Sequence, residues 1–204
     1  MAGNSTGPMQ AIRLVVGLGN PGREHAATRH NAGYWLADAL AAKLGAEFNG
    51  EAKFHGQVAK TVDGLRLLKP ATYMNLSGRS VSSLSRFFEL PPEVVLVVHD
   101  ELDLLPGEAK MKFGGGIAGH NGLRDVAAQL GTPGFWRLRL GIGHPRDSAI
   151  PQQDVADYVL APPSRDDRIA IADAIERSLD AWPALAAGDF ERAMLLLHTR
   201  TDKP

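Results

Sequence analysis

The chain contains no cysteine among its 204 residues. This absence excludes disulfides, thiolate metal ligands and cysteine nucleophiles, and it fits a protein of a reducing compartment, so we expect a cytoplasmic location. The charges nearly cancel, with 22 Lys and Arg against 23 Asp and Glu. A nucleic-acid surface would therefore have to be local. No apolar run approaches the roughly 20 residues that cross a bilayer, which excludes a membrane span.

The remaining composition is that of a globular protein, with 44% apolar and 22% charged residues. At roughly 100–200 residues per domain, the length predicts one domain over residues 11–204. Residues 1–10 carry no signal-peptide pattern, and a second methionine follows at Met9. We expect them to form a flexible N-terminal tail or an expression remnant.

Alternating strand and helix patterns run along the chain. Strands are predicted at Ile12 to Leu18, Phe54 to Lys60, Leu65 to Lys69, Val94 to Val98, Ala109 to Phe113 and Phe135 to Ile142. Helices are predicted at Ala32 to Leu44, Ser77 to Leu90, Leu123 to Leu130, Ser164 to Leu179 and Phe190 to His198, and Pro183 is expected to end or kink the fourth. These elements predict an α/β fold, a single domain whose central mixed, mostly parallel β-sheet is flanked by helices in three α/β/α layers.

Two motifs match the residue spacing of known sites but lack the structural context that those sites require. The segment from Gly17 to Gly22 has the glycine spacing of a dinucleotide-binding turn, but the following residues are polar and no acid ends a second strand at the expected distance. A purely structural glycine turn is the stronger alternative. The segment from Gly3 to Gly7 has the spacing of a serine-hydrolase elbow, but it lacks the strand and helix that such an elbow requires.

One histidine and one carboxylate are placed to form a catalytic pair. His30 precedes the first helix, and Asp100 follows a predicted central strand, at the sheet edge where open α/β folds hold their sites. Such a pair fixes the imidazole tautomer and stabilises its protonated form during base catalysis. Three alternatives stay open: a capping or surface histidine, a solvated acidic loop, and a divalent-metal site formed by His99, Asp100, Glu101 and Asp103.

Three asparagines, Asn20, Asn75 and Asn121, stand at the ends of predicted elements. Each offers a neutral donor and acceptor that can bind an ester carbonyl or an oxyanion. Turn and cap roles remain the alternative for each.

A basic stretch extends from Lys110 to Arg146, with six Lys and Arg against one Asp, a balance of +5. It contains His120, His144 and three consecutive glycines, whose backbone amides can approach an anion. The stretch is therefore the best candidate for a phosphate-binding face, with an ordinary charged surface as the alternative.

Taken together, the sequence resembles the bacterial-type peptidyl-tRNA hydrolases. The matching segments occur in family order over nearly the whole chain, from Ile12 to about Leu197. They are Val15 to Gly22, Thr28 to Asn31, Tyr73 to Gly78, His99 to Asp103, Gly119 to Leu123 and Arg137 to Pro145. Several motifs in one order are far more specific than any single glycine pattern.

The resemblance implies a monomeric, cofactor-free and metal-free esterase that acts on peptidyl-tRNA and recycles tRNA from stalled or prematurely released chains. The bond cut joins the C-terminal carbonyl of the peptide to the ribose of the 3′ adenosine. His30 would activate water, Asp100 would hold His30 in its basic form, and Asn20 would sense the blocked amino group.

The same resemblance implies the substrate contacts. Asn75 and Asn121 would bind the acyl group and the 3′ end of the tRNA, and Tyr73 and Met74 would shape the cleft. The cations that face phosphate would be Lys112 and Arg139.

This chain departs from the family pattern at two places. His25 stands where an aromatic residue is usual, and we retain it as a substrate-binding candidate. Ile117 and Ala118 interrupt a glycine-rich loop. Two rivals remain: an RNA-binding protein of the same fold without catalysis, and a metal-dependent hydrolase.

Overall fold

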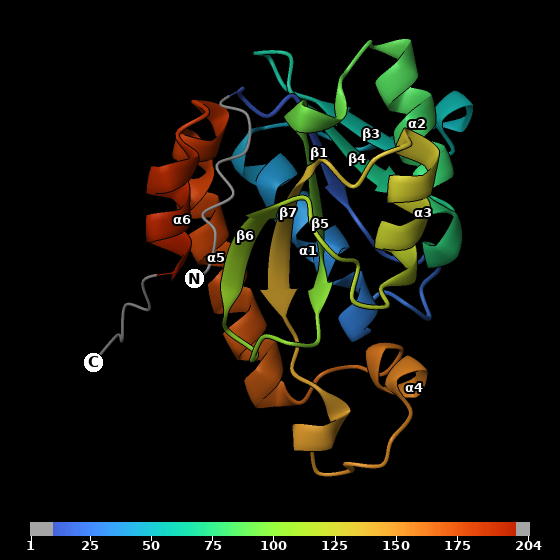
Figure 1. Ribbon diagram of the computed structural model, residues 1–204, viewed down its shortest axis with the longest axis vertical. Helices are drawn as coiled ribbons and strands as arrows, with labels where there is room; N and C mark the ends of the chain where they lie inside the picture. The colour runs from blue at the N-terminus through green and yellow to red at the C-terminus, as the bar shows by residue number, and fades with distance from the viewer. Residues whose placement is uncertain (1–9, 199–204) are drawn as a thin grey trace.

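The protein is described by a computed structural model over residues 10–198 (Figure 1). Most of the expected tail and the Gly3 to Gly7 motif lie outside these described residues. The strands form one sheet in the order β2-β3-β4-β1-β5-β7-β6. Their bounds are β1 (Leu14–Gly17), β2 (Asn49–Glu51), β3 (Gly56–Lys60), β4 (Arg66–Pro70), β5 (Val95–Glu101), β6 (Ala109–Phe113) and β7 (Trp136–Gly141).

The sheet is mixed and mostly parallel, which confirms the predicted fold class. Strands β4, β1, β5 and β7 are parallel neighbours at its centre. Among the strands of residues 10–198, only β3 and β6 run against the other five. The carboxyl ends of the central strands therefore share one edge, the usual place for a site in such folds.

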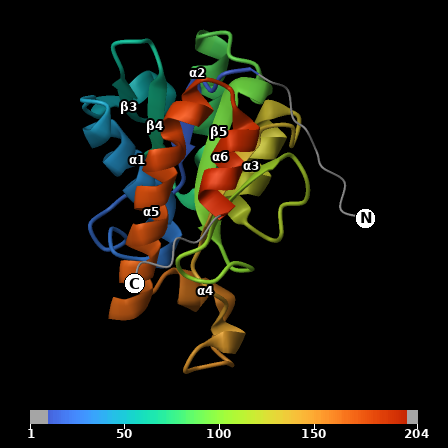
Figure 2. The same ribbon diagram turned by 90° about the vertical axis from the view of Figure 1, so that its left-hand side faces the viewer.

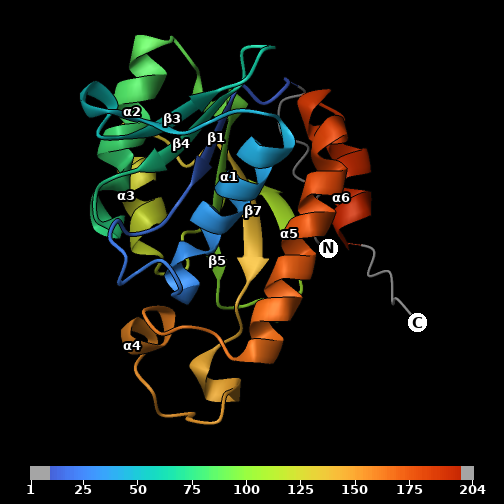
Figure 3. The ribbon, with the colours of Figure 1, turned by 180° about the vertical axis from the view of Figure 1, so that it is seen from behind.

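Helices cover both faces of the sheet (Figures 2 and 3). Helices α1 (Ala32–Lys43), α5 (Arg165–Ala186) and α6 (Phe190–His198) lie on one face, and α2 (Ser77–Phe87) and α3 (Asn121–Leu130) lie on the other. The short α4 (Val155–Val159) lies beyond the carboxyl ends of β5 and β7 (Figure 1). None of the helices between residues 10 and 198 is long and apolar enough to span a bilayer.

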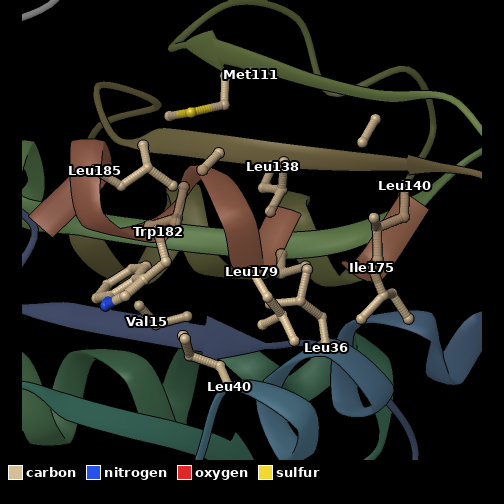
Figure 4. Packing of buried hydrophobic residues seen from close by; sticks show 14 of the residues in the cluster. Val15, Leu36, Leu40, Met111, Leu138, Leu140, Ile175, Leu179, Trp182 and Leu185 are labelled. Carbon is tan, nitrogen blue, oxygen red and sulfur yellow. The ribbon is translucent and has the colours of Figure 1, made fainter. Parts of the chain in front are cut away.

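Two apolar clusters separate the three layers because side chains alternate along the strands. In β1, Val15 belongs to the cluster beneath α1 and α5, whereas Leu14 and Val16 belong to the cluster beneath α2 and α3. Figure 4 shows the first cluster, where α5 contributes Leu179 and Trp182. This buried packing on both faces holds the central strands rigidly at the site edge.

The structure corrects several predicted boundaries. Strand β5 continues through Glu101, so Asp100 lies inside the strand and not after it. Helix α5 does not end at Pro183 but continues to Ala186, because Trp182 and Leu185 are buried against the core and their packing outweighs the missing N–H. Strand β2 and helix α4 were not predicted, since both are too short for a periodic pattern.

Candidate active site

A cavity of about 310 Å³ opens at the carboxyl ends of the central strands. Its walls come from the one-turn helix η1 (Arg29–Asn31), the end of β5, the start of α3 and helix α4. The loop that contains Ile117 and Ala118 and the side chain of His144 also line it. A larger cavity of about 410 Å³ lies near the amino ends of β1 and β4, but no histidine lines it. The smaller cavity is therefore the candidate for acid–base chemistry.

His30 and Asp100 meet in this cavity, as their sequence positions predict. Nδ1 of His30 lies 2.9 Å from each carboxylate oxygen of Asp100. Because an ionised carboxylate only accepts hydrogen bonds, Nδ1 carries the proton and Nε2 keeps its lone pair. His30 is thus held in the tautomer that a general base requires.

The electrostatics of the pair stabilise the imidazolium of His30 relative to that of a free histidine. Burial lowers the pKa of His30, but the charge of Asp100 and its hydrogen bond outweigh burial and raise that pKa overall. Burial likewise raises the pKa of Asp100, yet His30 and His120 hold it well below its usual range. The carboxylate therefore stays ionised and can stabilise an imidazolium beside it.

His120 is a further member of the site that the sequence analysis did not select. Its Nε2 lies 3.0 Å from Oδ1 of Asp100, and its Nδ1 accepts a hydrogen bond from the backbone N–H of Leu123 at 3.3 Å. These two contacts place the proton on Nε2. His120 lies in a motif segment and in the basic stretch, but only the approach of α3 to β5 places it against Asp100.

His99 contacts the backbone of the same aspartate. Its Nδ1 donates to the backbone oxygen of Asp100 at 2.7 Å, and its side chain is buried. Burial, helped by the nearby His120, lowers the pKa of His99 to about 3, so its ring is neutral. His99 therefore fixes the strand at Asp100 without adding charge.

The structure contradicts two of the alternatives for this acidic segment. A solvated loop is wrong, because Asp100 and Glu101 are buried within β5 and only Asp103 is exposed. The alternative metal site of His99, Asp100, Glu101 and Asp103 is not assembled among the described residues, since Glu101 binds Arg139 and Nδ1 of His99 binds a backbone oxygen. The side chains that do converge are those of His30, Asp100 and His120, whose ligand atoms lie within 4.8 Å of one another.

Asn20 connects the end of β1 to the neighbouring loops. Its backbone exchanges two hydrogen bonds with the side chain of Asn31, at 2.9 and 3.0 Å. Its Oδ1 accepts from the backbone N–H of Met74 at 2.7 Å. Among the described residues, no hydrogen bond uses Nδ2 of Asn20, which leaves that donor for a ligand.

The other predicted substrate contacts are divided between the cavity and its surroundings. Asn121 lines the cavity, and its Oδ1 accepts from Arg124 at 3.3 Å. Tyr73 and Asn75 are exposed, and they flank the buried Met74. A Cβ placed on Gly122 would lie only 2.5 Å from Sδ of Met74, so Met74 packs directly against the start of α3.

His25 lies outside the cavity wall, in the turn that leads to η1. Its side chain is about a quarter exposed, and Nε2 is 3.8 Å from Oε1 of Glu24. His25 precedes η1 in the same loop, but no hydrogen bond or ion pair joins it to the His30–Asp100 pair within the described residues.

The two predicted phosphate ligands lie on one face of strands β6 and β7. Lys110 is opposite Arg139 and Lys112 is opposite Arg137, so all four side chains project from the same face. Arg139 is paired with Glu101 at 2.9 Å, and Arg137 donates to two backbone oxygens of the glycine loop. Lys112 is exposed and has no ion pair within residues 10–198.

Arg29 connects the base to the far wall of the cavity. Its guanidinium donates to the backbone oxygens of Tyr158, Ala161 and Pro162 at 3.0 to 3.3 Å. The same group stacks on the ring of Tyr158, 4.0 Å from its centroid. These contacts hold the carboxyl end of α4 against η1, which carries His30.

Comparisons with known proteins show which family the chain resembles. A family model described as peptidyl-tRNA hydrolase matches residues 14–204. A peptidyl-tRNA hydrolase of Bordetella avium is 59% identical over 193 residues, which are 93% of each chain, and that of Variovorax paradoxus is 56% identical, with 92% of this chain and 89% of the relative covered. A crystal structure of peptidyl-tRNA hydrolase from Acinetobacter baumannii has a TM-score of 0.86 and 43% identity, and the match covers 92% of this chain and 95% of that one.

Proposed function

Because the chain belongs to the peptidyl-tRNA hydrolase family, we propose that it hydrolyses the ester between the carbonyl of an N-blocked aminoacyl or peptidyl group and the 3′-terminal ribose of tRNA. The observation that carries the proposal is the buried Asp100 carboxylate, which holds His30 with Nε2 free beside a cavity. The released tRNA would return to translation. The activity needs no cofactor in this proposal.

The reaction follows from the tautomer of His30. Nε2 takes a proton from water as the water oxygen attacks the ester carbonyl, and Asp100 stabilises the imidazolium that forms. The tetrahedral intermediate then expels the ribose oxygen, which takes the proton back from Nε2. One water molecule is consumed, and a free carboxylic acid and the tRNA hydroxyl are produced.

Neutral amides complete the proposed catalytic site. The free Nδ2 of Asn20 would recognise the blocked amino group of the substrate, and Asn75 and Asn121 would bind its acyl group and 3′ adenosine. Tyr73 and Met74 would form one side of the cleft that holds the substrate. His25, in the loop between β1 and η1, is the remaining candidate for a contact with the substrate.

The tRNA backbone would extend along the basic face of β6 and β7, where Lys112 and Arg139 would contact phosphate. We propose a monomer, because all proposed catalytic residues come from one chain. We also propose that it acts in the cytoplasm, where its tRNA substrate is used in translation.

The test compares release of an N-acetylated amino acid from its tRNA by the wild type and by His30→Ala, with EDTA present throughout. Loss of the base is expected to lower the rate by about 100- to 10,000-fold while tRNA affinity is retained. His198→Ala, which changes an exposed histidine on α6, serves as the matched control and should keep full activity.

The rival functions give different results in the same assay. A folded wild type that binds tRNA but releases no amino acid would be an RNA-binding protein without catalysis. Cleavage that appears only after Mg²⁺ or Zn²⁺ replaces EDTA would identify a metal-dependent hydrolase.

A further inference from the structure

The proposed catalytic pair and His120 together form a set of metal-ligating side chains, and the proposed reaction assigns no metal to it. Two imidazoles and one carboxylate, from η1, β5 and the residue preceding α3, have ligand atoms that all lie within 4.8 Å of one another. We propose that His30, Asp100 and His120 bind one divalent transition-metal ion such as Zn²⁺, and that the bound ion inhibits the enzyme. The inhibition, though not the binding, rests on the proposed function.

The ligand types and their spacing suit such an ion. Two imidazole nitrogens with one carboxylate oxygen form a set that binds Zn²⁺ in other proteins, and an open fourth position is filled by water. Ligands at about 2.1 Å from one tetrahedral ion are about 3.4 Å from each other. Here the nitrogen–oxygen distances are 2.9 and 3.0 Å and all three atoms lie within 4.8 Å, so only small side-chain movements are needed.

The cavity provides the route and the remaining space. All three residues line the same opening of about 310 Å³, which can admit an ion with its water ligands. The carboxylate of Asp100 is ionised, and its side chain is only 3% exposed. A bound ion would therefore replace the two hydrogen bonds of this carboxylate with a direct charge interaction in a poorly solvated place. Glu101 is not a competing ligand because Arg139 occupies it.

Metal binding and base catalysis require opposite tautomers of His30. The nitrogen that faces Asp100 now carries the proton, and it must give up that proton to coordinate an ion. The proton then resides on Nε2, which is the atom that has to accept a proton from water. An ion held at Nδ1 therefore inhibits the reaction even though it leaves the cavity open.

The same reasoning predicts a reversible site and not a permanent one. Coordination through Nε2 of His120 moves its proton to Nδ1, where the backbone N–H of Leu123 now donates. That N–H would lose its acceptor at the first turn of α3, which weakens the metal-bound state. Chelators should consequently remove the ion without unfolding the protein.

Two measurements on the full chain test the proposal. After treatment with EDTA and its removal, Co²⁺ titration followed by visible absorption should show one ion per chain in a low-symmetry nitrogen and oxygen site. In parallel, Zn²⁺ should inhibit ester cleavage at a similar stoichiometry, and added EDTA should restore the rate.

A pair of histidine variants locates the site. In His120→Asn, the amide oxygen can still accept from Leu123 but the ligand nitrogen is lost, and Co²⁺ affinity should fall by at least about ten-fold. His144 lines the same cavity, and its Nδ1 accepts from the backbone of Arg146, outside the ligand group. His144→Asn is the matched control and should bind Co²⁺ like the wild type. Inhibition of each variant is expressed relative to its own rate without metal.

The outcomes separate the two proposals. Absence of stoichiometric Co²⁺ binding, or equal affinity in His120→Asn and the wild type, overturns the metal site. Activation by Zn²⁺ overturns the inhibition. A wild type that cleaves nothing with or without metal refutes the proposed function, while the Co²⁺ titration still decides whether the site binds an ion.

Discussion

At the scale of single residues, the chemistry depends on which nitrogen of each histidine carries a proton. Asp100 receives hydrogen bonds from His30 and His120 through its side chain and from His99 through its backbone. All three imidazoles are thereby fixed as donors toward one buried residue. The tautomer of His30 is the consequence that matters for catalysis.

Replacing the carboxylate tests this dependence. In Asp100→Asn, the amide can donate to Nδ1 and favours the proton on Nε2, so kcat should fall by about 10⁴-fold with little change in tRNA affinity. Steady-state kinetics and a tRNA-binding isotherm measure the two quantities. Asp103→Asn, at an exposed neighbour, is the control, and an equal loss in both variants would contradict the role of Asp100.

His99 gives a prediction about stability and pH. The pKa of His99 is about 3 in the folded protein against 6.5 ordinarily, so between these values only the unfolded chain binds the proton. His99 therefore lowers the free energy of unfolding progressively as pH falls from about 6.5 toward 3. In His99→Asn, which keeps a donor to the Asp100 backbone, the urea midpoint should decline less over this range. Parallel declines would refute the buried neutral histidine.

Sequence reasoning at this scale was limited by contacts between distant segments. The pairing of His30 with Asp100 could be predicted because a base before a helix and an acid at a strand edge share one end of the sheet. The contact of His120 with Asp100 and that of Asn31 with Asn20 could not be predicted, since each depends on the path of a loop that the sequence pattern does not determine.

At the scale of elements, the close contact of α1 with the sheet positions the base. A Cβ on Gly33 would lie 2.5 Å from backbone atoms of Leu18 and of Val98, and one on Gly17 would lie 2.4 Å from the oxygen of Gly33. These glycines therefore permit the backbones to touch. Gly17, the first glycine of the motif from Gly17 to Gly22, thus has a packing role.

A single methyl group tests this contact. Gly33→Ala should lower the free energy of unfolding by about 1–3 kcal/mol, because backbone atoms and not flexible side chains must move. The cleavage rate should fall as well, since η1 directly precedes α1. Urea unfolding measures the first effect. Gly50→Ala on exposed β2 has nothing within 4 Å of the new methyl, and a comparable loss there would contradict the explanation.

The predicted elements were correct where burial is repetitive along the chain. Strand β1 and helices α1 and α2 form at the predicted places, although serines make up much of the buried face of α2 and Phe87 is exposed. The pattern failed at β5, whose last three residues are polar yet buried, because hydrogen bonds and ion pairs compensate them. Such exceptions to local pattern coincide here with the candidate site.

At the scale of the whole molecule, the net charge of −1 conceals an uneven distribution. Cations gather on one face of β6 and β7, although Arg137 and Arg139 are partly occupied by backbone oxygens and Glu101. The basic stretch was visible in the sequence, but its internal pairing was not. The positive charge of this face that is left for a ligand is therefore smaller than the balance of +5 in the sequence suggests.

Lys112 is the exposed cation of this face that tests tRNA binding. Lys112→Ala should weaken tRNA affinity and reduce the slope of its dependence on salt by about one. Lys43→Ala on α1, whose ammonium lies 3.7 Å from Asp180, is the matched control. Titrations at several salt concentrations measure both, and an unchanged slope for Lys112→Ala would place the phosphates elsewhere.

The guanidinium of Arg29 couples the positions of the two sides of the cavity. One side carries His30, and the other is α4 with the segment after it, held through the backbone oxygens of Tyr158, Ala161 and Pro162. Binding energies are reciprocal in such linked systems: whatever orders α4 also favours the aligned base, and an aligned base favours ordered α4 to the same extent. A substrate that packs against α4 would thus also favour the catalytic position of His30 on the opposite wall of the cavity.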